Sequence, residues 1–195
     1  MNIFRSKKQK AFLEKERLEN ALKHLYDYES KNGASTIDSL AGALGVSRRA
    51  ALTIEESLEN SKLISVVGEN IYMTHEGRSY ALKIIRIHRL WESYLADKTG
   101  VAQDMWHAEA EAREHLISEE EADHLASRLG NPLYDPDGDP IPDKNGNVPP
   151  RKGILLKDAK ENSYARITHI EDEPVDVYNQ IIAEKSLSGD DDTDS

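Results

Sequence analysis

Two short amphipathic segments separated by a glycine turn limit what residues 34–73 can fold into. Thr36 can cap a helix from Ile37 to Leu44, and Gly45 would end that helix. Ser47 can cap a second helix that runs from residue 48 to about residue 60. Two short helices joined by a tight glycine turn are typical of a helix-turn-helix unit.

The residues that follow predict a small hairpin. Residues 63–67 and 71–73 are rich in β-branched and aromatic side chains, and Gly68-Glu69-Asn70 between them is a turn signal. A helix-turn-helix followed by a hairpin is a winged helix. Its second helix would read DNA with the residues at its N-terminal end, namely Ser47, Arg48, Arg49, Ala50 and Thr53. The alternative is a helix-turn-helix that serves only for protein contacts.

The charge distribution permits this DNA-binding interpretation despite a net charge of −11. Residues 1–87 carry 14 Lys and Arg against 11 Asp and Glu, whereas residues 88–195 carry 11 against 25. The acidity therefore belongs to the second half, and the first half can approach phosphates. No apolar run reaches the length of a membrane span and the N-terminus lacks a secretory signal, so we expect a cytoplasmic protein without a membrane partner.

Imidazoles and carboxylates recur at helical spacing between residues 88 and 115. A long helix from about His75 to Lys98 and a second from Met105 to Leu116, capped by Asp104, would each present them on one face. These residue types bind divalent transition metals, and the absence of cysteine excludes thiolate sites. The candidate ligands are His88, Glu92, His107, Glu111, Glu114 and His115. A single His–Glu pair would more often be a surface ion pair, but six such residues together favour a metal site.

The remaining segments predict mostly local structure. Ser118 and Glu121 form a capping box for a helix over residues 119–129. The Asp135, Asp137, Asp139 run fails the calcium-loop template, because Pro140 stands where that loop needs glycine, so it is interpreted as a turn. Beyond it, the sequence predicts β segments over residues 154–156 and 164–170, a helix over 175–183 and an acidic tail from 187.

The runs HRLWESYL (88–95), HAEAEAREHLISEEEADHLASRLGNP (107–132) and DPDGDPIP (135–142) resemble the diphtheria-toxin-repressor family of metal-dependent regulators. The resemblance implies a mainly α fold with a small β wing. It implies a winged-helix domain with an N-terminal helical extension over residues 1–74 and a helical metal-binding and dimerisation domain over 75–142. Residues 143–195 would hold a linker, a partial SH3-like segment and the tail.

Carried over by position, the resemblance implies two metal sites. One consists of His88, Glu92 and His107, and the other of Glu111, Glu114 and His115. A first-helix ligand of the second site falls on Asn20, a weak neutral donor, with Lys23 one turn further along, and the neighbouring carboxylate of Glu19 could substitute. Oxygen and imidazole donors suit Mn(II) or Fe(II), and either is a candidate cofactor.

Two functions fit such a site. The first is a repressor that binds double-stranded operator DNA as a homodimer when loaded with metal, with no small-molecule substrate and no catalysis. The second is a metalloenzyme, either a hydrolase or an oxidase. The chain has no HExxH motif and no pair of Glu-x-x-His motifs on two helices, and a winged helix has no role in catalysis, so we expect the repressor.

Overall fold

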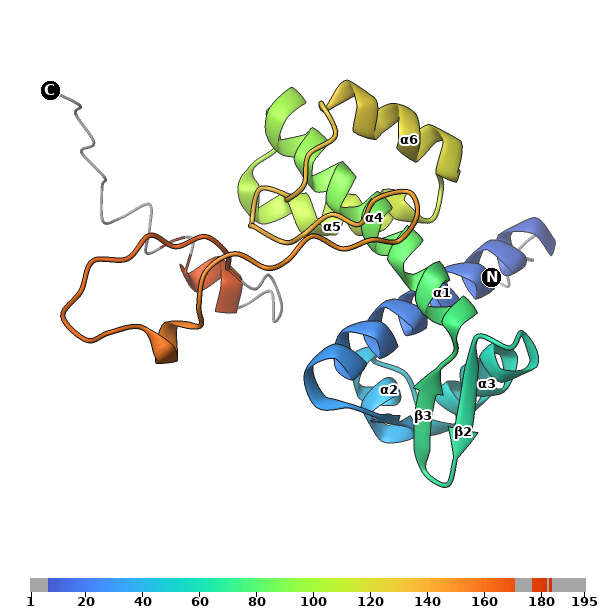
Figure 1. The fold of residues 1–195 in the computed structure, drawn as a ribbon. Coiled ribbons are helices and arrows are strands. Elements are labelled where there is room, and N and C mark those ends of the chain that lie inside the picture. Colours follow the sequence, from blue (N-terminus) through green and yellow to red (C-terminus); the bar gives the residue numbers. More distant parts are fainter. Residues whose placement is uncertain (1–6, 171–176, 182, 184–195) are drawn as a thin grey trace, which may run out of the picture.

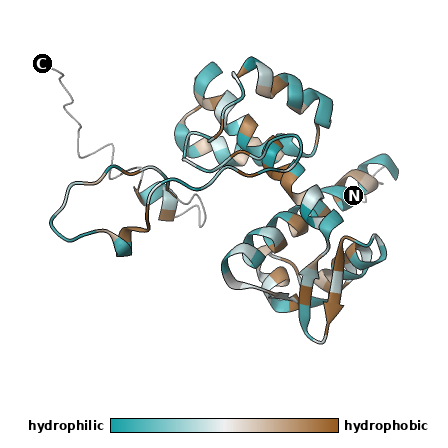
Figure 2. Ribbon diagram, viewed as in Figure 1, coloured by the Kyte–Doolittle hydropathy of each residue, from teal (hydrophilic) through white to brown (hydrophobic). Residues whose placement is uncertain are grey.

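The computed structural model describes residues 7–170, 177–181 and 183. The elements form a mainly helical protein with one small sheet (Figure 1). No helix among the described residues is long and apolar enough to cross a membrane. Figure 2 agrees with this, because its helices mix hydrophobic and hydrophilic residues.

The N-terminal unit has the predicted helix-turn-helix. It follows α1 (Lys7–Asn32) and consists of α2 (Ile37–Ala43) and α3 (Arg48–Asn60). Thr36 caps α2 by accepting a bond from the Ser39 amide, and Ser47 caps α3 through the Ala50 amide. Both caps were predicted, because a cap depends only on residues within one turn.

The wing is a three-stranded antiparallel sheet in the order β1-β3-β2. Strands β2 (Ile64–Val67) and β3 (Asn70–Met73) form the predicted hairpin, with Ile64 opposite Met73. The two-residue strand β1 (Ser35–Thr36) pairs with β3 and was not predicted. Leucine and isoleucine side chains from α1, α2, α3 and the sheet make one core, including Leu22, Leu25, Leu40, Leu58 and Ile71.

The second unit is built on α4 (His75–Lys98), which runs out of the winged helix and into this unit (Figure 1). Thr74 caps α4, and its hydroxyl also donates to the carbonyls of Lys62 and Leu63, so the helix start is tied to the wing. Helices α5 (Trp106–Glu114) and α6 (Glu119–Arg128) both pack on α4, and a second apolar cluster lies between α4 and α6. The capping box of α6 is present as predicted.

The prediction that Asp104 caps α5 was wrong. A short 3-10 helix, η1 (Gln103–Met105), precedes α5, and Met105 at the cap position makes no side-chain capping bond. The Asp135–Asp139 segment is the predicted turn, because the Asp135 carboxylate accepts the amides of Asp137 and Asp139.

The predicted β segments at residues 154–156 and 164–170 are not strands. The described part of this region holds only the short 3-10 helix η2 (Leu156–Asp158), and its apolar side chains are exposed, as at Leu156 and Ile167. A β-branched run without a partner strand has nothing to pair with. The SH3-like fold is therefore not seen. Of the predicted helix at 175–183, residues 177–181 and 183 are helical and the rest lie outside the described residues, as does the tail from 187.

Candidate metal centre

Three of the predicted ligands meet between α4 and α5. His88 and Glu92 lie one turn apart on α4, and His107 faces them from the first turn of α5. Nε2 of His88 is 3.0 Å from Oε1 of Glu92 and 3.2 Å from Nδ1 of His107, and the last two atoms are 3.5 Å apart. His88 and Glu92 are buried and His107 is half-buried.

This spacing suits a shared cation. Two donors each about 2.1 Å from one metal ion, at tetrahedral or octahedral angles, lie about 3.0 to 3.4 Å apart. The three donor atoms form a triangle with sides close to this range, and each is of a type that binds divalent metals. Within the part of the chain that the structure describes, this is the group of imidazole and carboxylate side chains that could hold a metal ion.

Without metal, hydrogen bonds among the two imidazoles and the carboxylate hold these three side chains together. Burial raises the pKa of Glu92, but the facing imidazoles of His88 and His107 outweigh it and hold the pKa well below its usual range. Burial and the charge of Lys23 lower the pKa of His88, yet its two carboxylate partners, Glu92 and Glu114, raise it on balance. A metal ion would therefore have to displace a proton that these carboxylates stabilise.

The second predicted set is arranged differently. Glu114 and His115 are buried and adjacent, with Oε1 of Glu114 3.3 Å from Nε2 of His115. The Glu111 side chain is 47% exposed, and its Oε1 is 3.9 Å from Nε2 of His107. The amide oxygen of Asn20 is buried and has no hydrogen-bond partner among the described residues.

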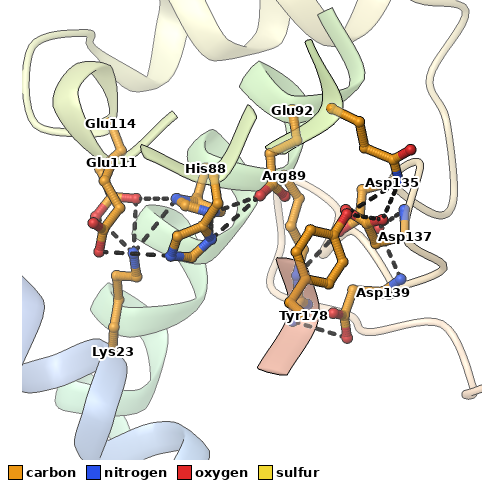
Figure 3. Close-up of polar contacts among 12 residues, drawn as sticks. Lys23, His88, Arg89, Glu92, Glu111, Glu114, Asp135, Asp137, Asp139 and Tyr178 are labelled. Carbon is orange, nitrogen blue, oxygen red and sulfur yellow. Dashed lines mark hydrogen bonds and ion pairs between the residues drawn. The ribbon is translucent and has the colours of Figure 1, made fainter. Parts of the chain in front are cut away.

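Two residues of α1 complete this second cluster: Glu19, which the sequence offered as a substitute ligand, and Lys23, which was not predicted as a partner. Lys23 donates to both oxygens of Glu114 at 2.8 Å, and Oε2 of Glu19 is 2.6 Å from Nδ1 of His115 (Figure 3 shows Lys23 and Glu114). Tyr80 of α4 donates to the other Glu19 oxygen at 2.5 Å. The i, i+4 spacing of Glu19 and Lys23 puts both residues on one face of α1, but it does not indicate their partners on α5 and at His115.

A neighbouring cluster lies on the other side of His88 (Figure 3). Arg89 donates to the Pro140 carbonyl at 2.6 Å and approaches the carboxylates of Asp139 and Asp135 at 3.3 and 3.7 Å. Tyr178 donates to Asp137 at 2.7 Å, which joins the C-terminal helical residues to the same turn. These contacts fasten the segment after α6 to α4.

The predicted DNA-reading residues gather at the start of α3. Ser47, Arg48, Arg49 and Thr53 are exposed, and Ala50 is half-buried behind them. The Arg48 guanidinium is 2.9 Å from the Asp38 carboxylate, but both side chains are more than half exposed. The two arginines therefore remain accessible to a phosphate backbone or a base edge.

Comparison with known proteins agrees with this architecture. A family model described as the iron dependent repressor, metal binding and dimerisation domain, matches residues 74–143. The iron-dependent repressor IdeR of Mycobacterium bovis is 33% identical over 122 residues, which are 62% of this chain and 53% of that protein. The diphtheria toxin repressor of Corynebacterium glutamicum is 31% identical over 122 residues, covering 62% and 54%. The chain thus spans about half the length of these relatives, which are named as repressors and not as enzymes.

A solved structure shares the fold over most of the chain. It is described as a manganese-dependent transcriptional repressor in complex with manganese, and it matches with a TM-score of 0.77 and 27% identity, over 86% of this chain and 78% of that one. In its winged-helix unit and its helical unit with the His–Glu–His triangle, the chain is similar to these iron- and manganese-dependent transcriptional repressors, and its residues 74–143 match their metal-binding and dimerisation domain.

Proposed function

We propose that this chain is a repressor that binds operator DNA as a dimer when a Mn(II) or Fe(II) ion is held by His88, Glu92 and His107. The convergence of three ligand atoms between α4 and α5 carries this proposal. The names of the relatives support both metals, and two imidazoles with one carboxylate suit either ion. When bound, the cation supplies a positive charge that fixes these side chains in one arrangement.

The helix that carries two of the ligands also supports the DNA reader. Helix α4 starts on the wing at Thr74 and reaches His88 and Glu92 within the same continuous helix. A change in how α5 packs against α4 is thereby transmitted to the winged-helix unit through α4 and through α1, which also packs on α4. Metal that binds the DNA-competent arrangement more tightly shifts the population towards it.

Exposed side chains support the proposed binding of DNA and of a second copy of the chain. Arg48 and Arg49 at the start of α3 are placed to contact DNA. Met105, Leu116 and Leu133 of the second unit are 46%, 63% and 62% exposed, and a second copy of the chain would cover such apolar surface. A dimer places two reading helices on one duplex, as operator recognition by such units requires. We place the protein in the cytoplasm, where operator DNA would be.

The test compares Glu92→Gln with wild-type protein in DNA-binding titrations. Fluorescence anisotropy with operator-containing DNA, with and without Mn(II) or anaerobic Fe(II), should show that metal raises the affinity of wild-type protein at least about tenfold. Glu92→Gln keeps the shape of the side chain but removes the charged ligand, so the metal effect should disappear. Glu120→Gln, an exposed carboxylate on α6, is the matched control and should respond to metal as wild type does.

DNA affinity that is indifferent to metal in wild-type protein would overturn the sensor function. Metal-dependent turnover of a substrate without metal-dependent DNA binding would favour an enzyme instead. A metal effect that survives in Glu92→Gln would show that the ligands lie elsewhere.

A further inference from the structure

The Glu114 carboxylate lies at the centre of the second cluster, and both of its oxygens are fully occupied by contacts with neighbouring side chains. Its side chain has no exposed surface. Oε1 lies 2.8 Å from the Lys23 ammonium and 3.3 Å from Nε2 of His115, and Oε2 lies 2.8 Å from the same ammonium and 2.5 Å from Nδ1 of His88. A carboxylate has about four lone-pair sites. These four contacts leave none for a further ligand.

The neighbouring candidate ligands, His115 and Glu19, already have partners as well. Nδ1 of His115 lies 2.6 Å from Glu19, so both nitrogens of that ring face a carboxylate. Glu19 in turn accepts from the Tyr80 hydroxyl. The remaining oxygens are those of Glu111, which is half-exposed and lies 3.9 Å from Nε2 of His107, and the neutral amide oxygen of Asn20, which has no hydrogen-bond partner among the described residues. One neutral amide and one exposed carboxylate are a poor site for a divalent ion next to an ammonium group.

We infer that Lys23 is the built-in cation of this cluster, so that the chain takes one metal ion per protomer, at His88, Glu92 and His107, and none at Glu111, Glu114 and His115. Lys23 lies on α1 with its ammonium directed at the Glu114 carboxylate (Figure 3), and its side chain is 19% exposed. The ammonium supplies the positive charge that a fully buried carboxylate requires. A divalent ion added there would lie next to this ammonium and would be repelled by it.

This arrangement also connects the single metal site to the winged-helix unit. His88 presents Nε2 to Glu92 and His107, and Nδ1 to Glu114. A metal ligand at Nε2 keeps its proton on Nδ1, which then donates to Glu114, and such a carboxylate orients the ring. Glu114 holds Lys23 of α1, whose Leu22 and Leu25 are in the core of the winged-helix unit. The connection from the metal to the reader therefore runs through His88, Glu114 and Lys23.

This inference rests on the proposed function for the first site, and metal stoichiometry separates the two. The full-length chain would be dialysed to equilibrium against excess Mn(II), and bound metal per protomer measured by mass spectrometry. Wild-type protein should bind one ion. Two ions in wild-type protein would overturn the inference and leave the proposed function standing, whereas no bound ion would overturn the proposed function.

Charge reversal at Lys23 tests whether its ammonium is what excludes a second metal ion. Lys23→Glu removes the ammonium and adds a carboxylate beside Glu114, so this variant should bind two ions. Combining Lys23→Glu with Glu114→Gln should abolish binding of the second ion again. Lys10→Glu changes the same charge on the exposed start of α1, about 20 Å along the helix, and should stay at one ion.

The neutral variant keeps the inference testable if Lys23→Glu fails to fold, which circular dichroism would show. Lys23→Met keeps most of the side-chain volume and frees both Glu114 oxygens from the ammonium. It should bind a second ion more weakly than the first. A single ion with wild-type affinity in the folded Lys23→Glu or Lys23→Met protein would show that Lys23 does not determine the stoichiometry.

Discussion

His88 is the residue on which the two clusters depend. One ring nitrogen faces the metal triangle and the other faces Glu114, so a change at either side alters the hydrogen bonding of the same imidazole. The ring is buried and flanked by carboxylates, and these raise its pKa on balance. Protonation of this ring competes with metal binding at Nε2, because a coordinated imidazole is neutral.

Asp135 is a buried carboxyl group that destabilises the fold when it ionises. Burial, with the nearby charges of Glu92 and Asp139, raises its pKa from 3.8 to about 8, and Arg89 only partly offsets this. The folded chain therefore keeps the Asp135 proton up to about pH 8, while the unfolded chain loses it near pH 4. Since the folded state then binds more protons, the stability contributed by this group falls as the pH rises between these values.

Asp135→Asn should remove this pH dependence. The amide keeps an oxygen that can accept the amides of Asp137 and Asp139, but it cannot ionise. Thermal unfolding should show the variant gaining on wild-type protein between about pH 5 and pH 8, by at most about 1.4 kcal/mol per pH unit. Asp158→Asn, at an exposed site, should show no such trend. A constant difference between Asp135→Asn and wild type across this range would mean that Asp135 is ionised throughout.

At the scale of elements, the junction between the wing and α4 is a very close backbone contact. A methyl group added at Gly77, in the first turn of α4, would lie 1.9 Å from the Leu63 carbonyl oxygen. That oxygen also accepts the amide and the hydroxyl of Thr74, so it cannot move without breaking the start of the helix. The junction therefore requires a glycine.

Gly77→Ala should destabilise the chain by roughly 3 kcal/mol or more, because overpacking against backbone costs at least as much as overpacking in a core. Gly42→Ala is the matched control. It lies in α2, where an added methyl group meets nothing within 4 Å, and it should stabilise by about 0.5 to 1 kcal/mol. Urea unfolding measures both. Equal effects of the two substitutions would contradict the close contact at Gly77.

Elements set by local chemistry were predictable from the sequence, and those set by distant partners were not. Thr36, Ser47 and Ser118 cap their helices with bonds to amides three residues on, which a sequence displays directly. Strand β1 exists only because Ser35 and Thr36 lie against β3, more than thirty residues away. The segments at 154–156 and 164–170 have strand-like composition but no such partner among the described residues.

The metal centre divides in the same way. Helical spacing predicted that His88 and Glu92 share a face, the resemblance grouped them with His107, and the three side chains do meet. The second set was also assigned by resemblance, and the residue that alters it, Lys23, lies 91 positions from its partner Glu114. No periodicity in α1 or α5 indicates that contact. It follows from the way α1 packs on α4 beside α5.

For the molecule as a whole, α4 connects the metal triangle to the winged-helix unit. The apolar residues of this helix lie on more than one of its faces. The structure buries them within one chain, since α1, α5 and α6 all pack on α4. Exposed apolar residues such as Met105 and Leu116 form the surface that we propose for contact with a second copy.

Coupling through α4 makes a reciprocal prediction about metal and DNA. If metal raises the affinity for operator DNA by a given factor, saturating operator DNA must raise the affinity for metal by the same factor. Replacing Arg48 and Arg49 together by alanine should weaken DNA binding and flatten its salt dependence, by about 0.9 in log–log slope for each phosphate that is no longer neutralised. The Arg48–Asp38 pair that this replacement removes is exposed at both ends, so the fold should persist.

Calorimetric titration of Mn(II) would test both statements. Without DNA, the double variant should bind metal as wild-type protein does, because the metal triangle is built from α4 and α5 alone. With operator DNA present, only wild-type protein should bind metal more tightly. An altered metal affinity of the DNA-free variant would mean that the arginines act on the metal site directly. Equal metal affinities of wild-type protein with and without DNA would mean that α4 does not couple the two sites.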